Sequence, residues 1–122
     1  MSNFSYIIIF IISILHFYIM YLEMFLWTSK KAQKIFKITP KFAEKTKTLA
    51  ANQWLYNGFL ASWLMISILL PTDIQTAKTI AIIFLIFIFI AWVYGWITSN
   101  KKIFFIQSIP AKIALITIYF NI

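Results

Sequence analysis

The chain has 122 residues, of which 62% are hydrophobic and only 11% are charged, and its mean hydropathy is +0.87. Soluble domains are about 45–50% apolar and about 25% charged, so the composition excludes a water-soluble globule and predicts a small integral membrane protein. The absence of cysteine excludes disulfides and thiolate metal sites. The net charge is +8, and all eleven basic residues are lysines.

The first predicted element is an apolar helix over about residues 4–27, long enough to cross the roughly 30 Å hydrocarbon core. Its apolar run is too long for a signal peptide, so we expect the helix to be retained. Glu23 and His16 are seven residues apart and share one helix face, beside Trp27. A charge inside the membrane costs about 2.5–3.5 kcal/mol on insertion scales. This cost favours a functional role for Glu23, whereas His16 fits a structural role equally well.

A polar connection over residues 28–48 follows and carries seven of the lysines. Ile35, Ile38 and Phe42 fall at helical spacing opposite a lysine stripe, and Pro40 limits any helix there to short pieces. An amphipathic segment on anionic lipid and a solvated determinant of topology explain the pattern equally well. Because the positive charge is concentrated in this connection, we expect membrane lipids and no nucleic acid as its partner.

The second span covers about residues 49–70 and ends before Pro71, which cannot continue a helix. The sequence TDIQ at residues 72–75 fits a capping box, in which Gln75 reaches back to the cap. The third span is therefore predicted over about residues 73–98.

A tight turn is predicted over residues 99–102, and the fourth span covers about residues 103–121. Pro110 interrupts this span, because proline lacks the backbone donor that a helix interior needs. The segment is therefore either a helix kinked at Pro110 or an interfacial stretch over residues 103–109 that leads into a shorter helix. We favour the kinked helix, since residues 110–121 alone are too short to cross a membrane.

Together the spans predict an all-α, four-helix transmembrane bundle that forms a single domain over residues 1–122. The lysines concentrate in the first and third connections, and positively charged loops stay on the cytoplasmic side of a membrane. We therefore expect a multi-pass protein with both termini on the extracytoplasmic side.

Polar side chains from all four spans fall in the cytoplasmic leaflet when the helices rise 1.5 Å per residue. The second span contributes an arc of amides and tyrosines, which we expect to face the other helices because lipid-exposed amides are costly. Interhelical hydrogen bonds, worth roughly 0.6 kcal/mol on average, explain the amides as well as a ligand site does. The candidate ligand-binding residues of this predicted pocket are His16, Glu23, Trp27, Asn52, Gln53, Tyr56, Asn57, Tyr94 and Gln107.

Lys112 is predicted near the middle of the membrane, at the depth of His16, and we expect it to approach that histidine or a water beside it. No catalytic or metal motif is recognisable. With one histidine and no cysteine, we expect no metal, and the two glycines form no phosphate-binding loop, so we expect no cofactor.

Segments from all four spans carry a family resemblance. They are HFY at 16–18 with YLEMFLW at 21–27, ANQ at 51–53 with LYNGFLA at 55–61, YG at 94–95, and Gln107 with PA at 110–111. With these segments the chain resembles the short bacterial membrane proteins catalogued as domain of unknown function 1304. The resemblance implies a four-helix, multi-pass protein of the bacterial inner membrane and brings no established activity. Trp54 departs from the small residue expected there, and Lys112 is not part of the pattern.

Two classes of function remain open. The first is an oligomeric module that binds or transports a small amphipathic or ionic ligand, with Glu23 as charge partner or proton carrier. The second is a membrane-embedded enzyme on a lipid-like substrate, with Glu23 or His16 as general base and Asn57, Tyr56 or Tyr94 as hydrogen-bond donors.

The enzyme class has a layout similar to the membrane-associated eicosanoid and glutathione metabolism proteins, whose glutathione-binding arginines this chain lacks. A structural accessory subunit, which needs no pocket, is a third alternative. We expect a homo-oligomer whose partners are membrane lipids and a small-molecule ligand.

Overall fold

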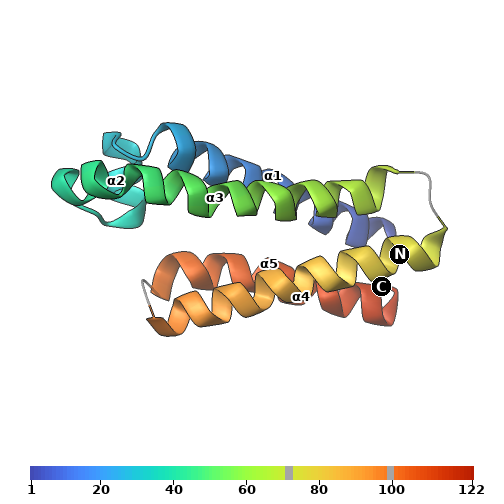
Figure 1. The fold of residues 1–122 in the computed structure, drawn as a ribbon. Helices are drawn as coiled ribbons and strands as arrows, with labels where there is room; N and C mark the ends of the chain where they lie inside the picture. The colour runs from blue at the N-terminus through green and yellow to red at the C-terminus, as the bar shows by residue number, and fades with distance from the viewer. Residues whose placement is uncertain (71–72, 99–100) are drawn as a thin grey trace.

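The computed structural model describes residues 1–70, 73–98 and 101–122, and for residues 101–107 it describes the backbone only. The chain forms five α-helices, which confirms the all-α prediction (Figure 1). They are α1 (Asn3–Phe25), α2 (Lys30–Phe36), α3 (Pro40–Leu69), α4 (Ile74–Thr98) and α5 (Lys101–Phe120).

The four long helices pack in a ring, and the short helix α2 lies at one end of it (Figure 1). Helix α1 contacts α3, α3 contacts α4, α4 contacts α5, and α5 returns to α1. The N- and C-termini lie together at the end opposite α2 (Figure 1). There the Ser2 hydroxyl donates to the carbonyl of Ile122 at 2.6 Å, and the hydroxyls of Ser5 and Thr117 are 3.0 Å apart.

Two of the described helices, α1 and α4, are long and apolar enough to cross a membrane by length and composition. The described side chains of α5 form a shorter apolar stretch over Ser108–Phe120. Helix α3 is the longest at 30 residues, and its first turns carry lysines.

The prediction that Pro40 limits helices in the polar connection to short pieces is wrong after this proline, since residues 40–48 form the first turns of the 30-residue helix α3. Thr39 caps this helix by accepting a hydrogen bond from the backbone N–H of Phe42 at 3.1 Å. Pro40 occupies the first helical position, where its missing N–H would have no helical partner. The proline therefore begins α3 and separates it from α2.

The cap of α4 is Asp73, one residue later than the capping box predicted. Its carboxylate accepts from the backbone N–H of Thr76 at 2.9 Å and from the Thr76 hydroxyl at 2.6 Å. The Thr76 hydroxyl thus bonds the second carboxyl oxygen of Asp73. Thr72, the cap that the capping box predicted, lies outside the described residues.

Helix α5 is continuous across Pro110, as the kinked-helix alternative requires. It begins at Lys101, so Lys101 and Lys102 are helical and do not belong to a turn as predicted. Residues 99–100 lie outside the described part of the chain.

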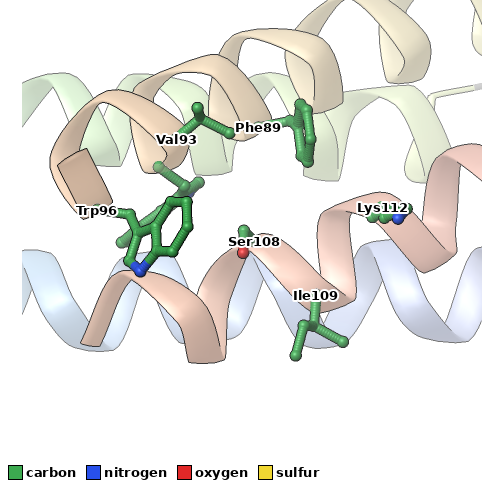
Figure 2. A pocket seen from close by; sticks show the side chains of 7 residues that line it. Phe89, Val93, Trp96, Ser108, Ile109 and Lys112 are labelled. Atoms are coloured by element: carbon green, nitrogen blue, oxygen red, sulfur yellow. The ribbon is translucent and has the colours of Figure 1, made fainter. Parts of the chain in front are cut away.

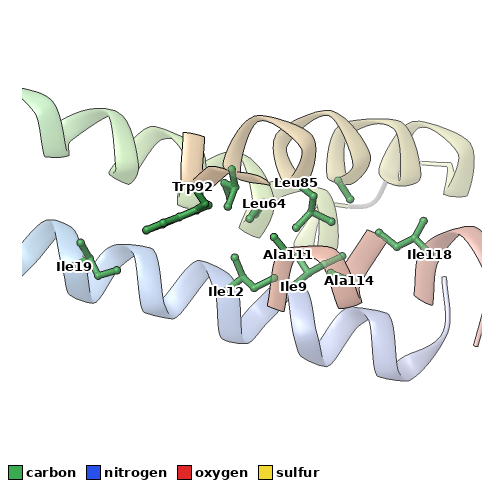
Figure 3. Close-up of a cluster of buried hydrophobic side chains, with 11 residues drawn as sticks. Ile9, Ile12, Ile19, Leu64, Leu85, Trp92, Ala111, Ala114 and Ile118 are labelled. Carbon is green, nitrogen blue, oxygen red and sulfur yellow. The ribbon is translucent and has the colours of Figure 1, made fainter. Parts of the chain in front are cut away.

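The hydrophobic core runs along the axis of the ring, where large aliphatic side chains meet small ones (Figure 3). Helix α5 contributes Ala111 and Ala114 to this core, both fully buried, which allows close packing of the helices. The principal large core residues are Ile9, Ile12, Ile19, Leu64, Leu85, Ile88 and Trp92.

Candidate functional site

Glu23 is fully buried, with 0% of its surface exposed. Neither of its carboxyl oxygens has a hydrogen-bond partner among the residues that the structure describes. Buried polar groups in proteins are hydrogen-bonded in the great majority of cases, because leaving one unpaired costs about 1–3 kcal/mol and more for a charge. Glu23 is therefore an exception that requires an explanation.

The two other acidic side chains of the chain are satisfied. Glu44 accepts from the ammonium group of Lys47 at 2.6 Å on the exposed surface, and Asp73 caps α4. Hydrogen bonds of Asp73 to the side chain and backbone of Thr76 lower the pKa of its carboxyl. Glu23 thus differs from both in burial and in hydrogen bonding.

His16 is buried as deeply as Glu23, and one of its two ring nitrogens has a partner. Its Nδ1 lies 2.8 Å from the carbonyl oxygen of Ile12, and because a carbonyl only accepts, Nδ1 carries the proton. In the neutral ring Nε2 is then an acceptor, and it has no hydrogen-bond partner within the described part of the chain. The edge of the ring packs against Trp92, with centroids 5.6 Å apart and planes at 79°.

His16 and Glu23 lie on one face of α1, as predicted from their spacing. Both belong to its buried stripe, and a separation of seven residues corresponds to about 10 Å along the helix axis. The stripe therefore places a ring nitrogen near mid-helix and a carboxyl two turns closer to the lysine-rich end, and neither has a hydrogen-bond partner among the residues that the structure describes.

Three aromatic side chains form a cluster around the short helix α2. Trp27 packs against Phe36 of α2 with centroids 5.2 Å apart, and Phe36 packs against Trp54 of α3 at 6.3 Å. The indole N–H of Trp27 donates to the hydroxyl of Thr46 at 3.0 Å. This aromatic cluster of Trp27, Phe36 and Trp54 joins α2 to α3, and Trp27 follows Glu23 by four residues in the sequence, just after the end of α1.

Two cavities flank Trp92. One, of about 130 Å³, lies between α3 and α4 and is lined in part by Gln53 and Asn57. The other, of about 370 Å³, lies between α4 and α5 and includes Lys112 in its lining (Figure 2). Neither of these two cavities is lined by Glu23 or His16, although Trp92 lines both and touches His16.

The prediction that the whole polar arc of α3 faces other helices is wrong for this single chain. Asn52 and Gln53 are exposed, Tyr56 is 65% exposed, and only Asn57 is half-buried. The reason is the rotation of α3, whose buried stripe consists of small residues and Leu64. Its members are Ala43, Ala50, Gly58, Ala61, Leu64 and Ser67.

The remaining candidates have mixed positions. Tyr94 is 69% exposed and points away from the bundle, whereas Trp27 is half-buried in the aromatic cluster. The side chain of Gln107 lies outside the described residues. The predicted direct pairing of Lys112 with His16 is absent, since no described residue bonds to Nε2 of that histidine.

Trp92 is the site residue that sequence reasoning missed. It is 5% exposed, lies against His16 and lines both cavities. The sequence offers five tryptophans and no pattern that distinguishes this one. Its importance arises from a contact between α1 and α4, which are far apart in the chain.

Comparison with known proteins gives a family and no activity. The family model described as "Protein of unknown function (DUF1304)" matches residues 10–119. The chain is 34% identical to the uncharacterized protein YpaA of Lactococcus lactis subsp. lactis (strain IL1403). That alignment covers 98% of this chain and 100% of the relative. No solved structure matches the chain.

Proposed function

We propose a function for this chain, which belongs to the family of proteins of unknown function DUF1304. Because the family supplies no activity, the proposal rests on the geometry of the chain itself. In this proposal the chain is a multi-pass membrane protein that binds or transports a small ligand, with Glu23 as charge partner or proton carrier. The single observation that carries this proposal is the complete burial of Glu23 with both carboxyl oxygens unpaired among the described residues.

The length and apolar composition of α1 and α4 support the membrane assignment. All seven lysines of residues 28–48 are exposed, and they lie at the end of the bundle opposite the termini. This arrangement supports a cytoplasmic lysine-rich end and extracytoplasmic termini, as in a bacterial inner membrane. Phe42 and Ile35 are exposed among the lysines, which supports contact of this end with anionic lipid.

The proposed ligand class follows from the chemistry of a buried carboxyl that has no partner among the described residues. A carboxylate in a low-dielectric interior is stabilised by a cation or by hydrogen-bond donors, and a protonated carboxyl needs an acceptor. A small ligand that brings a positive charge or a proton to Glu23 satisfies this requirement. Gln53 and Asn57 of the neighbouring helix α3 line a separate cavity against α4, which adds polar groups to the same bundle but does not include Glu23.

We include a homo-oligomer in the proposal. Asn52 and Tyr56 are exposed on α3 in the single chain, and a second copy would shield the amide of Asn52 from lipid.

Native mass spectrometry of the purified protein tests both parts of the proposal. Wild-type protein, Glu23→Gln and the control Glu44→Gln are compared for oligomer mass and for co-purified small molecules. We expect a bound species in the wild type and in Glu44→Gln, and its loss in Glu23→Gln, because glutamine keeps the shape of the side chain and removes its ionisable group. Identical spectra for all three proteins would contradict the role of Glu23.

The enzyme alternative is favoured by one observation, the buried Nε2 of His16, which no described residue bonds and which is the nitrogen that a general base would use. A membrane-embedded enzyme predicts that lipid extracts of cells producing the wild type differ from those of cells producing His16→Gln. Extracts with the same lipid composition would remove this alternative.

A further inference from the structure

The larger cavity, between α4 and α5, combines an apolar wall with one positive charge among the described side chains that line it (Figure 2). Phe89, Trp92, Val93 and Trp96 of α4 form one side, and Lys112 of α5 lies on the other. Its volume of about 370 Å³ falls in the range of roughly 300–1,000 Å³ that is usual for small-molecule sites. The lining therefore suits a molecule with a large apolar part and one anionic group.

Lys112 is far from both ends of its helix. It lies eleven residues after Lys101 and eight before Phe120, which correspond to about 16 Å and 12 Å along the axis. Its side chain is exposed, and no hydrogen bond or ion pair joins it to another described residue. A charged side chain at this depth in a membrane normally pairs with an opposite charge or with polar groups.

We propose that the cavity between α4 and α5 binds a single-chain amphipathic anion, a fatty-acid carboxylate. The carboxylate pairs with the ammonium group of Lys112, and the hydrocarbon chain packs along Trp92, Trp96 and Phe89. This site goes beyond the ligand proposed for Glu23, because it lies between other helices and selects the opposite charge.

Depth and volume favour a fatty acid over a phospholipid. The headgroup of a phospholipid stays in the polar region of a bilayer that is about 40–45 Å thick in total, whereas Lys112 lies mid-helix. A carboxylate is small enough to enter the cavity and reach Lys112 at this depth. A cavity of about 370 Å³ also suits one hydrocarbon chain better than two.

The test uses dibromostearate, because bromine quenches tryptophan fluorescence on contact and Trp92 and Trp96 line the cavity. The full chain is reconstituted into phosphatidylcholine vesicles and titrated with the acid and with its methyl ester. Lys112→Met removes the charge and keeps an unbranched side chain, and Lys112→Arg keeps the charge. Lys78→Met is the matched control, since Lys78 is a half-buried lysine near the start of α4.

We expect saturable quenching of the wild type by dibromostearate and an increase in Kd of about tenfold or more in Lys112→Met, as loss of a charge-assisted bond implies. Lys112→Arg and Lys78→Met are expected to bind within about threefold of the wild type, within the ordinary spread of a surface substitution. Trp96→Phe should lower the quenched amplitude without changing Kd.

The proposal is overturned if Lys112→Met binds the acid as tightly as the wild type, or if the methyl ester binds the wild type as tightly as the acid. The proposal would also be overturned if brominated phosphatidylglycerol quenched the fluorescence saturably and as strongly as dibromostearate, because the site would then recognise a phospholipid headgroup. This titration and the mass spectra of Glu23→Gln report on different sites, so either proposal can fail alone.

Discussion

Glu23 and Glu44 are the same side chain in opposite environments. Glu44 is 64% exposed and paired with Lys47, an arrangement that contributes roughly 0–1 kcal/mol because water already solvates both charges. Glu23 has no exposed surface and no hydrogen-bond partner among the described residues. Burial, and not residue type, therefore makes Glu23 the candidate for function.

The difference predicts selective chemical labelling. Dicyclohexylcarbodiimide partitions into hydrocarbon, so we expect it to modify Glu23 in membranes and to leave Glu44 and Asp73 unmodified. A water-soluble carbodiimide should show the reverse selectivity, because those two side chains are exposed. Peptide mass spectrometry locates the label, and Glu23→Gln should abolish labelling by the hydrophobic reagent. Absence of this label from Glu23, or its presence on Glu44 or Asp73, would contradict the difference in burial between these carboxyls.

At the scale of the helices, small residues determine how α1 and α3 meet. A Cβ atom added at Gly58 would collide with the sulfur of Met20, so glycine allows the two helices to approach closely at this level. The same stripe of small residues turns Asn52 and Tyr56 outward.

Gly58→Val should therefore destabilise the protein by about 1–3 kcal/mol, the usual range for overpacking. Thermal unfolding in detergent, followed by circular dichroism, measures the change. The matched control is the same substitution in a Met20→Ala background, where the shorter side chain makes room and the loss should be smaller. Equal losses in the two backgrounds would show that Met20 is not the obstacle.

We expect the start of α4 to depend on pH through Asp73, which precedes the apolar span. Its pKa is lowered in the folded state by the side-chain and backbone hydrogen bonds of Thr76. A lowered folded pKa means that the stabilisation is complete above the unfolded value of 3.8 and is lost as the pH falls through the folded value. Asp73→Asn should therefore be less sensitive than the wild type to pH below about 4 when unfolding is measured across acidic pH. Identical acid profiles would exclude this role of the Asp73 carboxylate.

At the scale of the whole molecule, the lysine-rich segment and the two chain termini lie at opposite ends of the bundle. The four long helices alternate in direction, so both termini lie at one end, where the Ser2 hydroxyl donates to the Ile122 carbonyl at 2.6 Å (Figure 1). The lysine-rich residues of α2 and early α3 lie at the other end. From this separation we expect the lysine-rich end to lie in the cytoplasm when the bundle is inserted in a membrane.

Reporter fusions test this orientation. Alkaline phosphatase, which is active only outside the cytoplasm, should be active when fused after Ile122. A green fluorescent protein fusion at the same position, exported through the general secretory route, should remain dark. A fluorescent C-terminal fusion would contradict the topology.

Much of the fold could be predicted because its signals are local. The apolar runs located α1 and α4 to within a few residues, and Pro71 marked the end of α3 correctly. The start of α3 could not be found by hydropathy, because Thr39 and Pro40 begin the helix within a lysine-rich segment. In the candidate site, the common face of His16 and Glu23 was predictable, whereas the outward position of Tyr56 and Tyr94 was not.

The sequence by itself determined that the chain is helical, that it belongs to its family, and that Glu23 shares a helix face with His16. These properties depend on hydrophobic runs, motifs and the helical repeat, all of which act over a few residues. Only the tertiary structure decided that Trp92 packs on His16, that Glu23 is buried without a partner among the described residues, and that Lys112 lines a cavity. Those properties depend on which helices are neighbours and how each is rotated, and close packing between distant segments determines both.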